Sequence, residues 1–347
     1  MLPENEQRLD RRSLIGSALG TAAFAAASVG DAAAEEELPR PTETRKGDML
    51  YRSFGKTGES VSAIGVGGSH VGKTEEALAT RIVRSAIDRG VTFMDNSWDY
   101  NDGDGQGEVK MGKALRDGYR QRVFLMTKVD GRTKDAAAKQ LEESLKRLQT
   151  DRVELLQFHE VIRMEDADRF FAPGGAIEAF EAARKAGKTR WVGFTGHKDP
   201  AIHLRMLELA KQHNYHFDAV LFPSNPMDFT FRSFVHQVMP VALKEGIAVQ
   251  TMKPMGGKVL LTSNAVTATE CLQYALSQPA SVVIHGMETM DQLEHALGVV
   301  KTFKSMTAAQ ITDLTNRAKQ AAAAGKFELY KTTTHFDSTA KNPSWLG

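Results

Sequence analysis

The chain has 347 residues, of which 41% are hydrophobic and 25% are charged, and its formal net charge is +1. These values are typical of a globular protein and argue against intrinsic disorder, and the balanced charge gives no indication of a nucleic-acid partner. A single cysteine, Cys271, excludes both an internal disulfide framework and a metal cluster held by cysteines.

The N-terminal segment has the layout of a secretory signal. Arg11 and Arg12 precede a run without charged residues at 13–30, and the alanines at 32–34 offer an A-x-A cleavage site. The paired arginines and the weakly hydrophobic core resemble a twin-arginine signal. We therefore expect the twin-arginine export machinery to recognise residues 1–34 and the mature chain to be periplasmic or otherwise exported. The alternatives are a disordered extension or a retained anchor, but the run is short and weak for a spanning helix, so no stable membrane anchor is expected.

The next two segments lead into the folded part of the chain. Residues 35–48 are polar and contain proline, which predicts a flexible lead-in. Residues 49–62, with the sequence MLYRSFGKTGESVS, predict two short strands around a turn at 55–58, which is a β-hairpin signal. We expect residues 49–347 to form one barrel domain with a C-terminal extension.

From residue 63 onward, short apolar runs alternate with amphipathic segments. Leu141, Leu145 and Leu148 share one helix face, and Gly90 and Gly246 fall where helices should stop. The predicted strands are 63–68, 92–96, 123–129, 153–159, 190–196, 219–225, 248–254 and 281–287.

Eight strands that alternate with eight helices predict an α/β fold, a closed parallel (β/α)8 TIM barrel. A doubly wound sheet is the rival, but GVGGSH at 65–70 is not the G-x-G-x-x-G fingerprint of that fold. Beyond residue 306 the sequence predicts one extra helix followed by an irregular end.

Polar side chains follow three of the predicted strands at the point where each strand ends. Asp95 and Tyr100 follow the second strand, and Lys128 and His159 lie at the ends of the next two. Because a parallel barrel presents catalytic groups at the carboxyl ends of its strands, we expect these side chains to meet. Each residue alone is more often structural than catalytic, but their joint placement favours catalysis.

The motifs around these residues resemble those of the aldo-keto reductases. The match covers residues 49 to about 306 and runs through FMDNSWDYNDGDGQGEVKMGKAL, MTKV, SLKRLQTDRVELLQFHE, GKTRWVGFTGH and MKPMGG, and GFTGHKDP and NPSWLG look like a bacterial subgroup. The resemblance implies an NAD(P)-dependent oxidoreductase that acts on a small carbonyl or alcohol substrate. It also implies that Asp95, Tyr100, Lys128 and His159 form the catalytic tetrad, and we expect Trp98 to line the substrate mouth.

The roles of the four residues follow from the negative charge that hydride transfer leaves on a carbonyl oxygen. Tyr100 can supply a proton as the general acid, although an ordinary phenol has a pKa of about 10. We expect the positive charge of Lys128 to lower that pKa, and Asp95 to pair with Lys128. His159 can donate a second hydrogen bond to the same oxygen.

The resemblance also implies a site for an extended nicotinamide dinucleotide across the carboxyl face. Leu221 replaces the usual carboxamide-binding glutamine, Met252 the usual stacking tyrosine, and Ala296 the usual asparagine of the adenosine segment. The usual basic residue for a 2′-phosphate is absent too, so the cofactor is NADP or NAD, and only the resemblance favours NADP. The residues implied for cofactor binding are Gly67, Gly68, Asp95, Thr195, Gly196, His197, Met252, Lys253, Pro254, Gly256, Gly257, Lys258, Met287 and Gln292.

Two further functions stay open. The departures at Leu221 and Met252 fit a nicotinamide-nucleotide-binding sensor or a barrel protein of low turnover. A metal-dependent barrel hydrolase is disfavoured because no metal-ligand motif occurs in the sequence, so no metal site is expected. Since the twin-arginine route carries folded protein, we expect the nucleotide to be bound before export.

Overall fold

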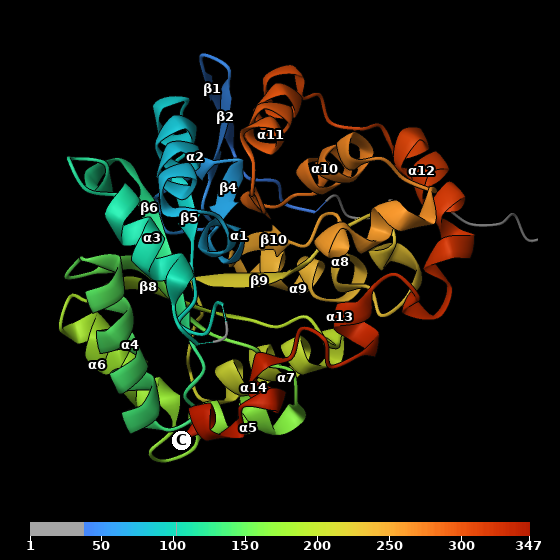
Figure 1. Ribbon diagram of the computed structural model, residues 1–347. Coiled ribbons are helices and arrows are strands. Elements are labelled where there is room, and N and C mark those ends of the chain that lie inside the picture. Colours follow the sequence, from blue (N-terminus) through green and yellow to red (C-terminus); the bar gives the residue numbers. More distant parts are fainter. Residues whose placement is uncertain (1–37, 102) are drawn as a thin grey trace, which may run out of the picture. The chain divides into compact units, whose positions relative to one another are not determined.

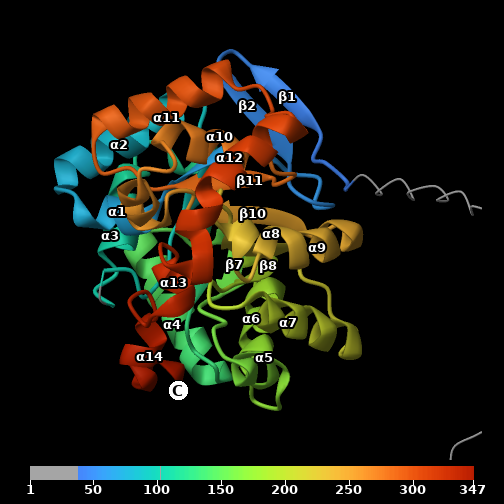
Figure 2. The same ribbon diagram turned by 90° about the vertical axis from the view of Figure 1, so that its right-hand side faces the viewer.

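Eight parallel strands close into a barrel with helices around it, as the computed structural model shows (Figure 1 and Figure 2). This confirms the predicted (β/α)8 TIM barrel. The structure describes residues 38–101 and 103–347, so the predicted signal at 1–34 lies outside the described residues. Within the described part, no helix is long and apolar enough to cross a membrane.

All eight predicted barrel strands are present, and each pairs in parallel with its neighbours in the chain, the last one closing onto the first. They are β4 (Ile64–Gly67), β5 (Phe93–Asp95), β6 (Phe124–Val129), β7 (Val153–Phe158), β8 (Thr189–Thr195), β9 (Ala219–Pro223), β10 (Ala248–Met252) and β11 (Val282–His285).

Alternate residues of each strand face the barrel interior, because successive side chains of a strand point to opposite sides. On β6, Phe124 and Met126 belong to the apolar cluster that fills the barrel, and Lys128 is the next residue of the same series. Leu155 on β7 belongs to the same cluster, and Gln157 follows it in register with Lys128. The interior therefore changes from apolar to polar toward the carboxyl ends of the strands.

The helices end where the glycines predict. Gly90 follows α2 with a φ of +95°, and Gly246 caps α9 with a φ of +78°, in the left-handed region that glycine adopts without strain. The helices are α1 (Gly68–Lys73), α2 (Glu76–Asp88), α3 (Gln106–Ala114), α4 (Lys134–Leu148), α5 (Met164–Phe171), α6 (Ala176–Lys185), α7 (Pro200–Gln212), α8 (Phe234–Gln237), α9 (Met239–Glu245), α10 (Ala268–Ser277), α11 (Met290–Thr302), α12 (Ala308–Ala322), α13 (Leu329–Thr332) and α14 (Ser338–Lys341), with 3-10 turns η1 (Arg120–Arg122), η2 (Asp228–Thr230), η3 (Gly256–Ser263), η4 (Ala323–Gly325) and η5 (Pro343–Leu346).

A small antiparallel sheet precedes the barrel. The predicted hairpin is present as β2 (Met49–Ser53) and β3 (Ser60–Ser62), but β1 (Glu43–Lys46) adds a third strand within the segment predicted to be a flexible lead-in. The backbone ladder to β2 orders this segment. The Arg45 guanidinium also holds it by donating to the carbonyl oxygen of Val300 on α11 at 3.2 Å. In Figure 1 the sheet lies beside α11.

The C-terminal segment also differs from the prediction. The extra helix is α12, but the end of the chain is not irregular, because residues 323–347 form η4, α13, α14 and η5. We call residues 323–347 the C-terminal belt. Arg163, directly before α5, donates to Thr339 Oγ1 in α14 at 3.4 Å, and Figure 1 shows both helices in the region where the chain ends. A buried ion pair holds the belt to the rest of the chain, because Lys331 Nζ lies 2.7 Å from Asp228 Oδ1. Glu328, itself in the belt, lies 2.9 Å from the same ammonium.

Candidate active site

The four predicted catalytic residues meet at the carboxyl end of the barrel. Asp95 ends β5 and Tyr100 lies in the loop after it, while Lys128 lies on β6 and His159 directly after β7. Lys128 Nζ lies 2.5 Å from Asp95 Oδ1 and 2.8 Å from the Tyr100 hydroxyl. The Tyr100 hydroxyl donates to Asp95 Oδ2 at 3.2 Å. The Tyr100 ring meets the His159 ring edge-on, with 6.0 Å between ring centroids.

The ammonium group of Lys128 is held in one position. Its side chain is only 1% exposed, and besides Asp95 and Tyr100 it donates to the carbonyl oxygen of Asn96 at 2.7 Å. An ammonium has three N–H donors, so these contacts use all of them. The Tyr100 hydroxyl is therefore fixed relative to both a cation and a carboxylate.

The electrostatic environment of Tyr100 corrects the sequence prediction. Burial raises the pKa of Tyr100 well above its ordinary value, and the carboxylates of Asp95 and Asp99 raise it further. Lys128 contacts the hydroxyl at 2.8 Å, but Asp95 lies closer to the ammonium, at 2.5 Å, and offsets its charge. The predicted lowering of the phenol pKa is therefore wrong, and Tyr100 keeps its proton at neutral pH.

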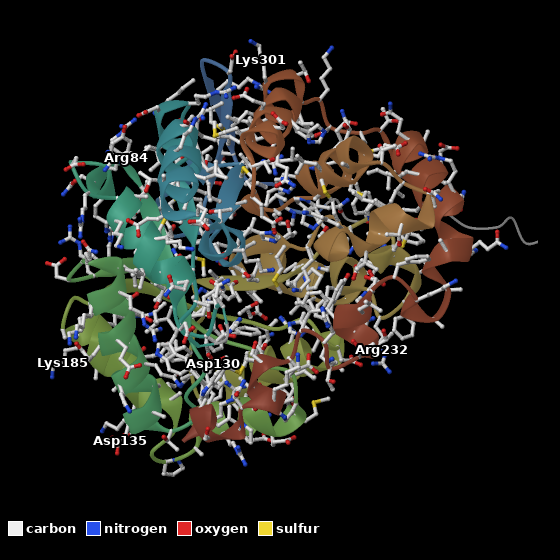
Figure 3. All side chains as sticks on the ribbon, in the orientation of Figure 1. Arg84, Asp130, Asp135, Lys185, Arg232 and Lys301 are labelled. Carbon is white, nitrogen blue, oxygen red and sulfur yellow. The ribbon has the colours of Figure 1, made fainter. Side chains whose placement is uncertain are left out.

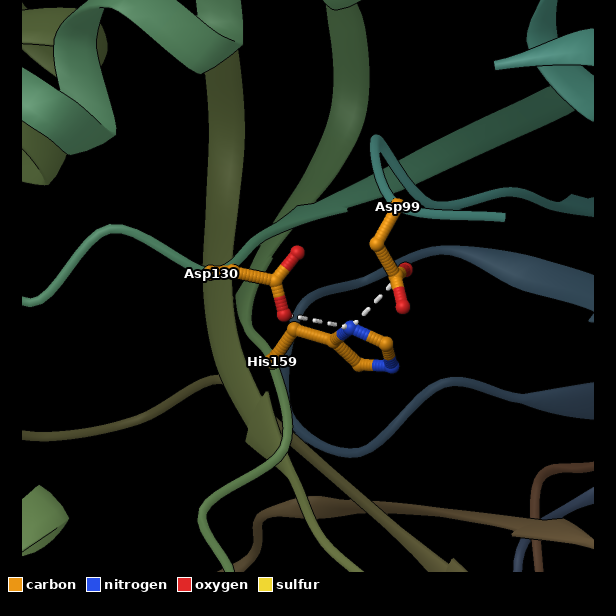
Figure 4. Close-up of side chains that lie close together, drawn as sticks. All are labelled: Asp99, Asp130 and His159. Atoms are coloured by element: carbon orange, nitrogen blue, oxygen red, sulfur yellow. Dashed lines mark hydrogen bonds and ion pairs between the residues drawn. The ribbon is translucent and has the colours of Figure 1, made fainter. Parts of the chain in front are cut away.

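Two aspartates that the sequence analysis missed face His159. Its Nδ1 lies 3.0 Å from Asp130 Oδ1 and 3.1 Å from Asp99 Oδ1, as Figure 4 shows. The Ser97 hydroxyl lies 3.2 Å from the same nitrogen and donates to Asp99 Oδ1 at 2.6 Å. Figure 3 shows Asp130 inside the molecule, whereas Asp135, only five positions later, points outward. Asp130 directly follows β6, so the strand-end rule that identified the tetrad could have found it.

The charges of this trio depend on one another. Burial lowers the pKa of His159, but the carboxylates of Asp99 and Asp130 outweigh it and raise that pKa to about 10. Burial, followed by the charge of Asp99, raises the pKa of Asp130 to about 7. Burial opposes the ionisation of Asp99, yet the charge of His159 lowers the pKa of Asp99 below its usual value. One ligand atom from each residue lies within 4.8 Å of the others, which is close enough for a metal ion.

Thr195 and Gln250 carry buried polar groups of the kind that can hydrogen-bond a carboxamide such as that of nicotinamide. Thr195 on β8 is in register with Leu221 on β9, and Leu221 is in register with Gln250 on β10. In the described part of the chain, the Thr195 hydroxyl and both amide atoms of Gln250 are buried without a hydrogen-bond partner. Such groups normally have partners, and a carboxamide both donates and accepts hydrogen bonds. Leu221 itself packs into the apolar barrel interior.

The residues that follow Thr195 at the end of β8 are held by neighbouring loops and by the belt. Gly196 is buried against the Val161 backbone, where a Cβ atom would lie 2.3 Å from a carbonyl oxygen, so no larger residue fits. His197 Nε2 lies 3.0 Å from Asp337 Oδ1 in the belt, and burial lowers the pKa of His197. Because Asp337 also pairs with Lys198 at 2.8 Å, this contact ties the belt to the barrel.

The Lys253 side chain is a cation near the site, and it has no ionic partner among the described residues. Its ammonium lies over the rings of Phe336 and Tyr330, 4.4 Å and 5.7 Å from their centroids. Burial lowers the pKa of Lys253 to about 8, and the charge of Lys128 contributes to this lowering. Lys253 has a φ of +55°, a conformation that residues other than glycine seldom adopt. Met252 before it is half-buried and Pro254 after it is buried.

The loop after Lys253 turns through three residues with positive φ, and its backbone is open at Gly257. Gly256, Gly257 and Lys258 all have positive φ values, of 55°, 69° and 75°. At Gly257 an added Cβ atom would meet only the Phe336 ring, at 3.4 Å, so the backbone there is open to close approach. Lys258, which is exposed to solvent, pairs through its ammonium with Glu288 at 3.0 Å. An acidic group therefore lies beside this lysine.

The remaining residues predicted to bind cofactor have packing and capping roles in the structure. Gly68 begins α1, where a Cβ atom would lie 2.4 Å from the Asp95 carbonyl oxygen, and Gly67 precedes it at the end of β4. Met287 is fully buried in the core between the barrel and its helices. Gln292 Oε1 accepts a hydrogen bond from the Glu288 N–H at 2.7 Å, near the start of α11.

Trp98 connects the tetrad loop to the belt. Its indole N–H donates to Glu143 Oε2 on α4 at 2.7 Å. Its ring meets Trp345 of the belt edge-on, with 5.3 Å between centroids. The belt therefore reaches the loop that carries Tyr100, at the mouth where Trp98 is predicted to line the substrate site.

Known proteins resemble this chain in sequence and in fold. The Aldo/keto reductase family matches residues 63–270. The chain is 30% identical over 244 residues to the uncharacterized oxidoreductase YrpG of Bacillus subtilis, covering 64% of this chain and 72% of that protein. It is 34% identical over 160 residues to the L-galactose dehydrogenase of Arabidopsis thaliana, covering 42% and 48%. A solved aldo-keto reductase from Bacillus halodurans, AKR11C1 in its holo form, has the same fold, with a TM-score of 0.63, 22% identity and coverage of 79% and 96%. The chain belongs to the aldo/keto reductase family of oxidoreductases.

Proposed function

We propose that the protein is an NAD(P)H-dependent oxidoreductase that reduces an aldehyde or ketone to an alcohol, or catalyses the reverse reaction, with Tyr100 as general acid and base. One observation carries this proposal: the Tyr100 hydroxyl is fixed between the Lys128 ammonium and the Asp95 carboxylate at the mouth of the barrel. A bound nicotinamide cofactor supplies the hydride. The comparisons support an oxidoreductase of this family.

The chain's own residues handle the proton. Because the pKa of Tyr100 is raised, the phenol is protonated and ready to donate to a carbonyl oxygen that gains negative charge. Lys128 lies 2.8 Å from the phenolic oxygen and stabilises the phenolate that remains after the transfer. Asp95 holds Lys128 in place, and His159 offers a second donor to the substrate oxygen.

Thr195, Gln250 and Lys253 are the residues that we propose hold the cofactor most directly. The first two offer buried hydrogen-bonding groups without partners in the described chain, and Lys253 offers a cation for a phosphate. The pairing of Lys258 with Glu288 weakens the case for Lys258 as a 2′-phosphate ligand, so both NADP and NAD remain candidates.

The test is to mix the purified protein with NADPH or NADH, to follow the fluorescence shift of the nucleotide, and then to follow aldehyde-dependent oxidation. Tyr100→Phe should bind nucleotide like the unmodified protein but lose about 10²–10⁴-fold in turnover, because the general acid is gone. Unchanged turnover of Tyr100→Phe would show that another residue supplies the proton.

A second candidate is a nicotinamide-nucleotide-binding sensor or a barrel protein of low turnover. It is favoured by Leu221, whose side chain packs among apolar residues where the family commonly places a carboxamide ligand. The same experiment separates the candidates, since nucleotide binding without turnover across a broad panel of aldehydes and ketones would favour the sensor.

We further propose export by the twin-arginine route with the nucleotide already bound. The support is the signal-like sequence at 1–34, with Arg11 and Arg12 before its uncharged run. Protein recovered from the periplasm should release nucleotide on acid denaturation. An Arg11→Lys/Arg12→Lys variant is the control, and it should stay in the cytoplasm. Exported protein that contains no nucleotide would contradict loading before export.

A further inference from the structure

We propose that Asp99 and Asp130 are positioning residues that hold His159 as a doubly protonated imidazolium, so that His159 presents a charged N–H donor to the carbonyl oxygen. The part of this inference that concerns substrate rests on the proposed function. The protonation state of His159 is a property of the folded protein and can be tested without any substrate.

The first step concerns Nδ1 of His159. Two carboxylate oxygens lie 3.0 and 3.1 Å from it, and ionised carboxylates only accept hydrogen bonds. A bare Nδ1 lone pair would face both oxygens and be repelled. A protonated Asp130 could donate a hydrogen bond to an unprotonated Nδ1. The Asp99 oxygen would then still face the same lone pair and be repelled by it. The arrangement therefore requires a proton on Nδ1.

The second step concerns the other ring nitrogen. A neutral imidazole carries one N–H, so a neutral His159 with its proton on Nδ1 would present Nε2 as an acceptor. An acceptor cannot stabilise negative charge on a carbonyl oxygen. Figure 4 shows Nδ1 turned toward both carboxylates and the other nitrogen turned away from them. His159 can therefore act as a donor at Nε2 only when both nitrogens are protonated.

The third step concerns the balance of charge. Asp130 is fully buried, and the side chains of Asp99 and His159 are 2% and 11% exposed, so water screens their attraction weakly. This is why the two carboxylates overcome the burial of His159 and raise its pKa to about 10. Removal of both carboxylates would leave burial as the dominant effect and would favour the neutral ring.

Other charged groups around the trio do not reverse this balance. Tyr100 lies edge-on to the ring, and the Lys128 ammonium is bound to Tyr100 and Asp95. Arg132 donates to the backbone carbonyl oxygens of Asp130 and His159 at 2.6 and 3.0 Å, but its guanidinium is paired with Asp166 at 3.0 Å. Glu160 is a further anion, and its carboxylate accepts from the N–H groups of Ser338 and Thr339, both at 2.8 Å.

The pH range of the imidazolium follows from these shifts. The raised pKa of His159 means that its charge persists as the pH rises through neutrality and is lost only near pH 10. Below about pH 7 Asp130 takes up a proton and holds the ring less strongly, but Asp99, whose pKa is lowered, stays ionised. His159 is thus cationic on both sides of neutral pH. A charged donor gives a stronger hydrogen bond than a neutral one, and His159 keeps both protons while Tyr100 transfers its own.

The direct test is nuclear magnetic resonance of the full chain labelled with ¹⁵N-histidine, at pH 8 and without substrate. The signal of His159, one of ten histidines, is the one missing from a His159→Asn spectrum. An imidazolium gives two ring nitrogens with similar shifts, and it loses neither ring proton between pH 6 and 9. The protonation of Asp130 near pH 7 should move the Nδ1 shift only slightly and leave the two shifts similar. Widely separated shifts at pH 8 indicate a neutral ring and overturn the proposal. A change on addition of a chelator overturns it too, because the trio then holds a metal ion.

The kinetic test compares Asp99→Asn/Asp130→Asn with Asp104→Asn, which removes an exposed carboxylate from the same loop. For the unmodified protein and Asp104→Asn, we expect kcat/KM for a carbonyl substrate to be level between pH 6 and 9. For the double variant we expect a loss of about 10²–10³-fold at pH 8, with recovery toward pH 5 as the ring gains its second proton. A double variant with the unmodified pH profile overturns the proposal.

The two tests distinguish a failure of this inference from a failure of the proposed function. If the double variant does not fold, the spectrum of the unmodified protein still decides the protonation state of His159. If no carbonyl compound is reduced by the unmodified protein, the proposed function is wrong, and the spectrum alone decides whether Asp99 and Asp130 hold an imidazolium.

Discussion

Tyr100 illustrates how a single residue depends on the charges buried beside it. Burial and the carboxylates of Asp95 and Asp99 raise the pKa of Tyr100, so its proton stays bound as the pH rises through the neutral range. Carbonyl reduction needs that proton, and alcohol oxidation needs the phenolate. We therefore expect the reduction rate to stay level from about pH 6 to 9 and the oxidation rate to rise over the same range. Steady-state kinetics in both directions measures this, and a reduction rate that falls steadily above pH 7 contradicts it.

The Lys128–Asp95 pair makes a second prediction at the scale of residues. Both side chains are buried, so Asp95→Asn leaves the ammonium without its counter-charge and should lower the free energy of unfolding by about 3–5 kcal/mol. Asp95→Asn/Lys128→Met removes both charges and should recover a large part of that loss. Urea unfolding of the two variants measures the difference. Equal stability of the single and double variants would contradict the expected recovery, because removal of the unpaired ammonium would then bring no gain.

Among the larger elements, the C-terminal belt owes its position to buried ionic contacts. Lys331 and its partners Asp228 and Glu328 have fully buried side chains, and the Lys331 ammonium also donates to the Phe231 carbonyl oxygen at 2.7 Å. The belt spans residues 323–347 and reaches Trp98 through Trp345. Its attachment to the barrel therefore combines buried ionic contacts with single aromatic contacts, and neither forms a periodic apolar face that a sequence would reveal.

Lys331→Met should release the belt. The substitution leaves two buried carboxylates without their cation, which costs about 3–5 kcal/mol and is relieved when the segment detaches. Limited proteolysis should then cut within 323–347 at least tenfold faster than in the unmodified protein. Lys341→Met is the matched control, because Lys341 lies in α14 of the same belt but is exposed. Equal cleavage of the two variants would contradict this role of Lys331.

The barrel strands could be predicted because each is a local apolar run, whereas the belt could not. The contact between Lys331 and Asp228 joins residues 103 positions apart, and no spacing in the sequence indicates it. The same holds for the charge on His159: the strand-end position of Asp130 is visible in the sequence, but its approach to the ring is not. Periodicity predicts elements and the faces that they bury, while the pKa of a buried group depends on distances that only the fold supplies.

Taken as a whole, the barrel interior changes along its axis from an apolar layer at the amino ends of the strands to a polar, catalytic layer at their carboxyl ends. At the amino ends of the strands, Phe54 packs against Phe93 and Phe124, with ring centroids 5.9 and 5.0 Å apart. Phe93 and Phe124 begin β5 and β6, whereas Asp95 and Lys128 lie near the carboxyl ends of these strands. In barrels of this kind, the amino face contributes stability and the carboxyl face carries the active site.

Phe54→Ala tests this arrangement, because Phe54 is fully buried and its ring contacts Phe93 and Phe124, the first residues of β5 and β6, and not the tetrad. The cavity left by the ring should lower the free energy of unfolding by about 3–5 kcal/mol. Turnover and KM, measured at a temperature where the variant stays folded, should change less than about twofold because no contact of Tyr100 is altered. Phe229→Ala removes a ring that is 47% exposed and should change stability by no more than about 0.5 kcal/mol. A large loss of turnover in Phe54→Ala would mean that the loss of packing at the amino ends of the strands disturbs the tetrad. Such an effect could pass along β5 and β6, because these strands carry both the rings that contact Phe54 and the tetrad residues Asp95 and Lys128.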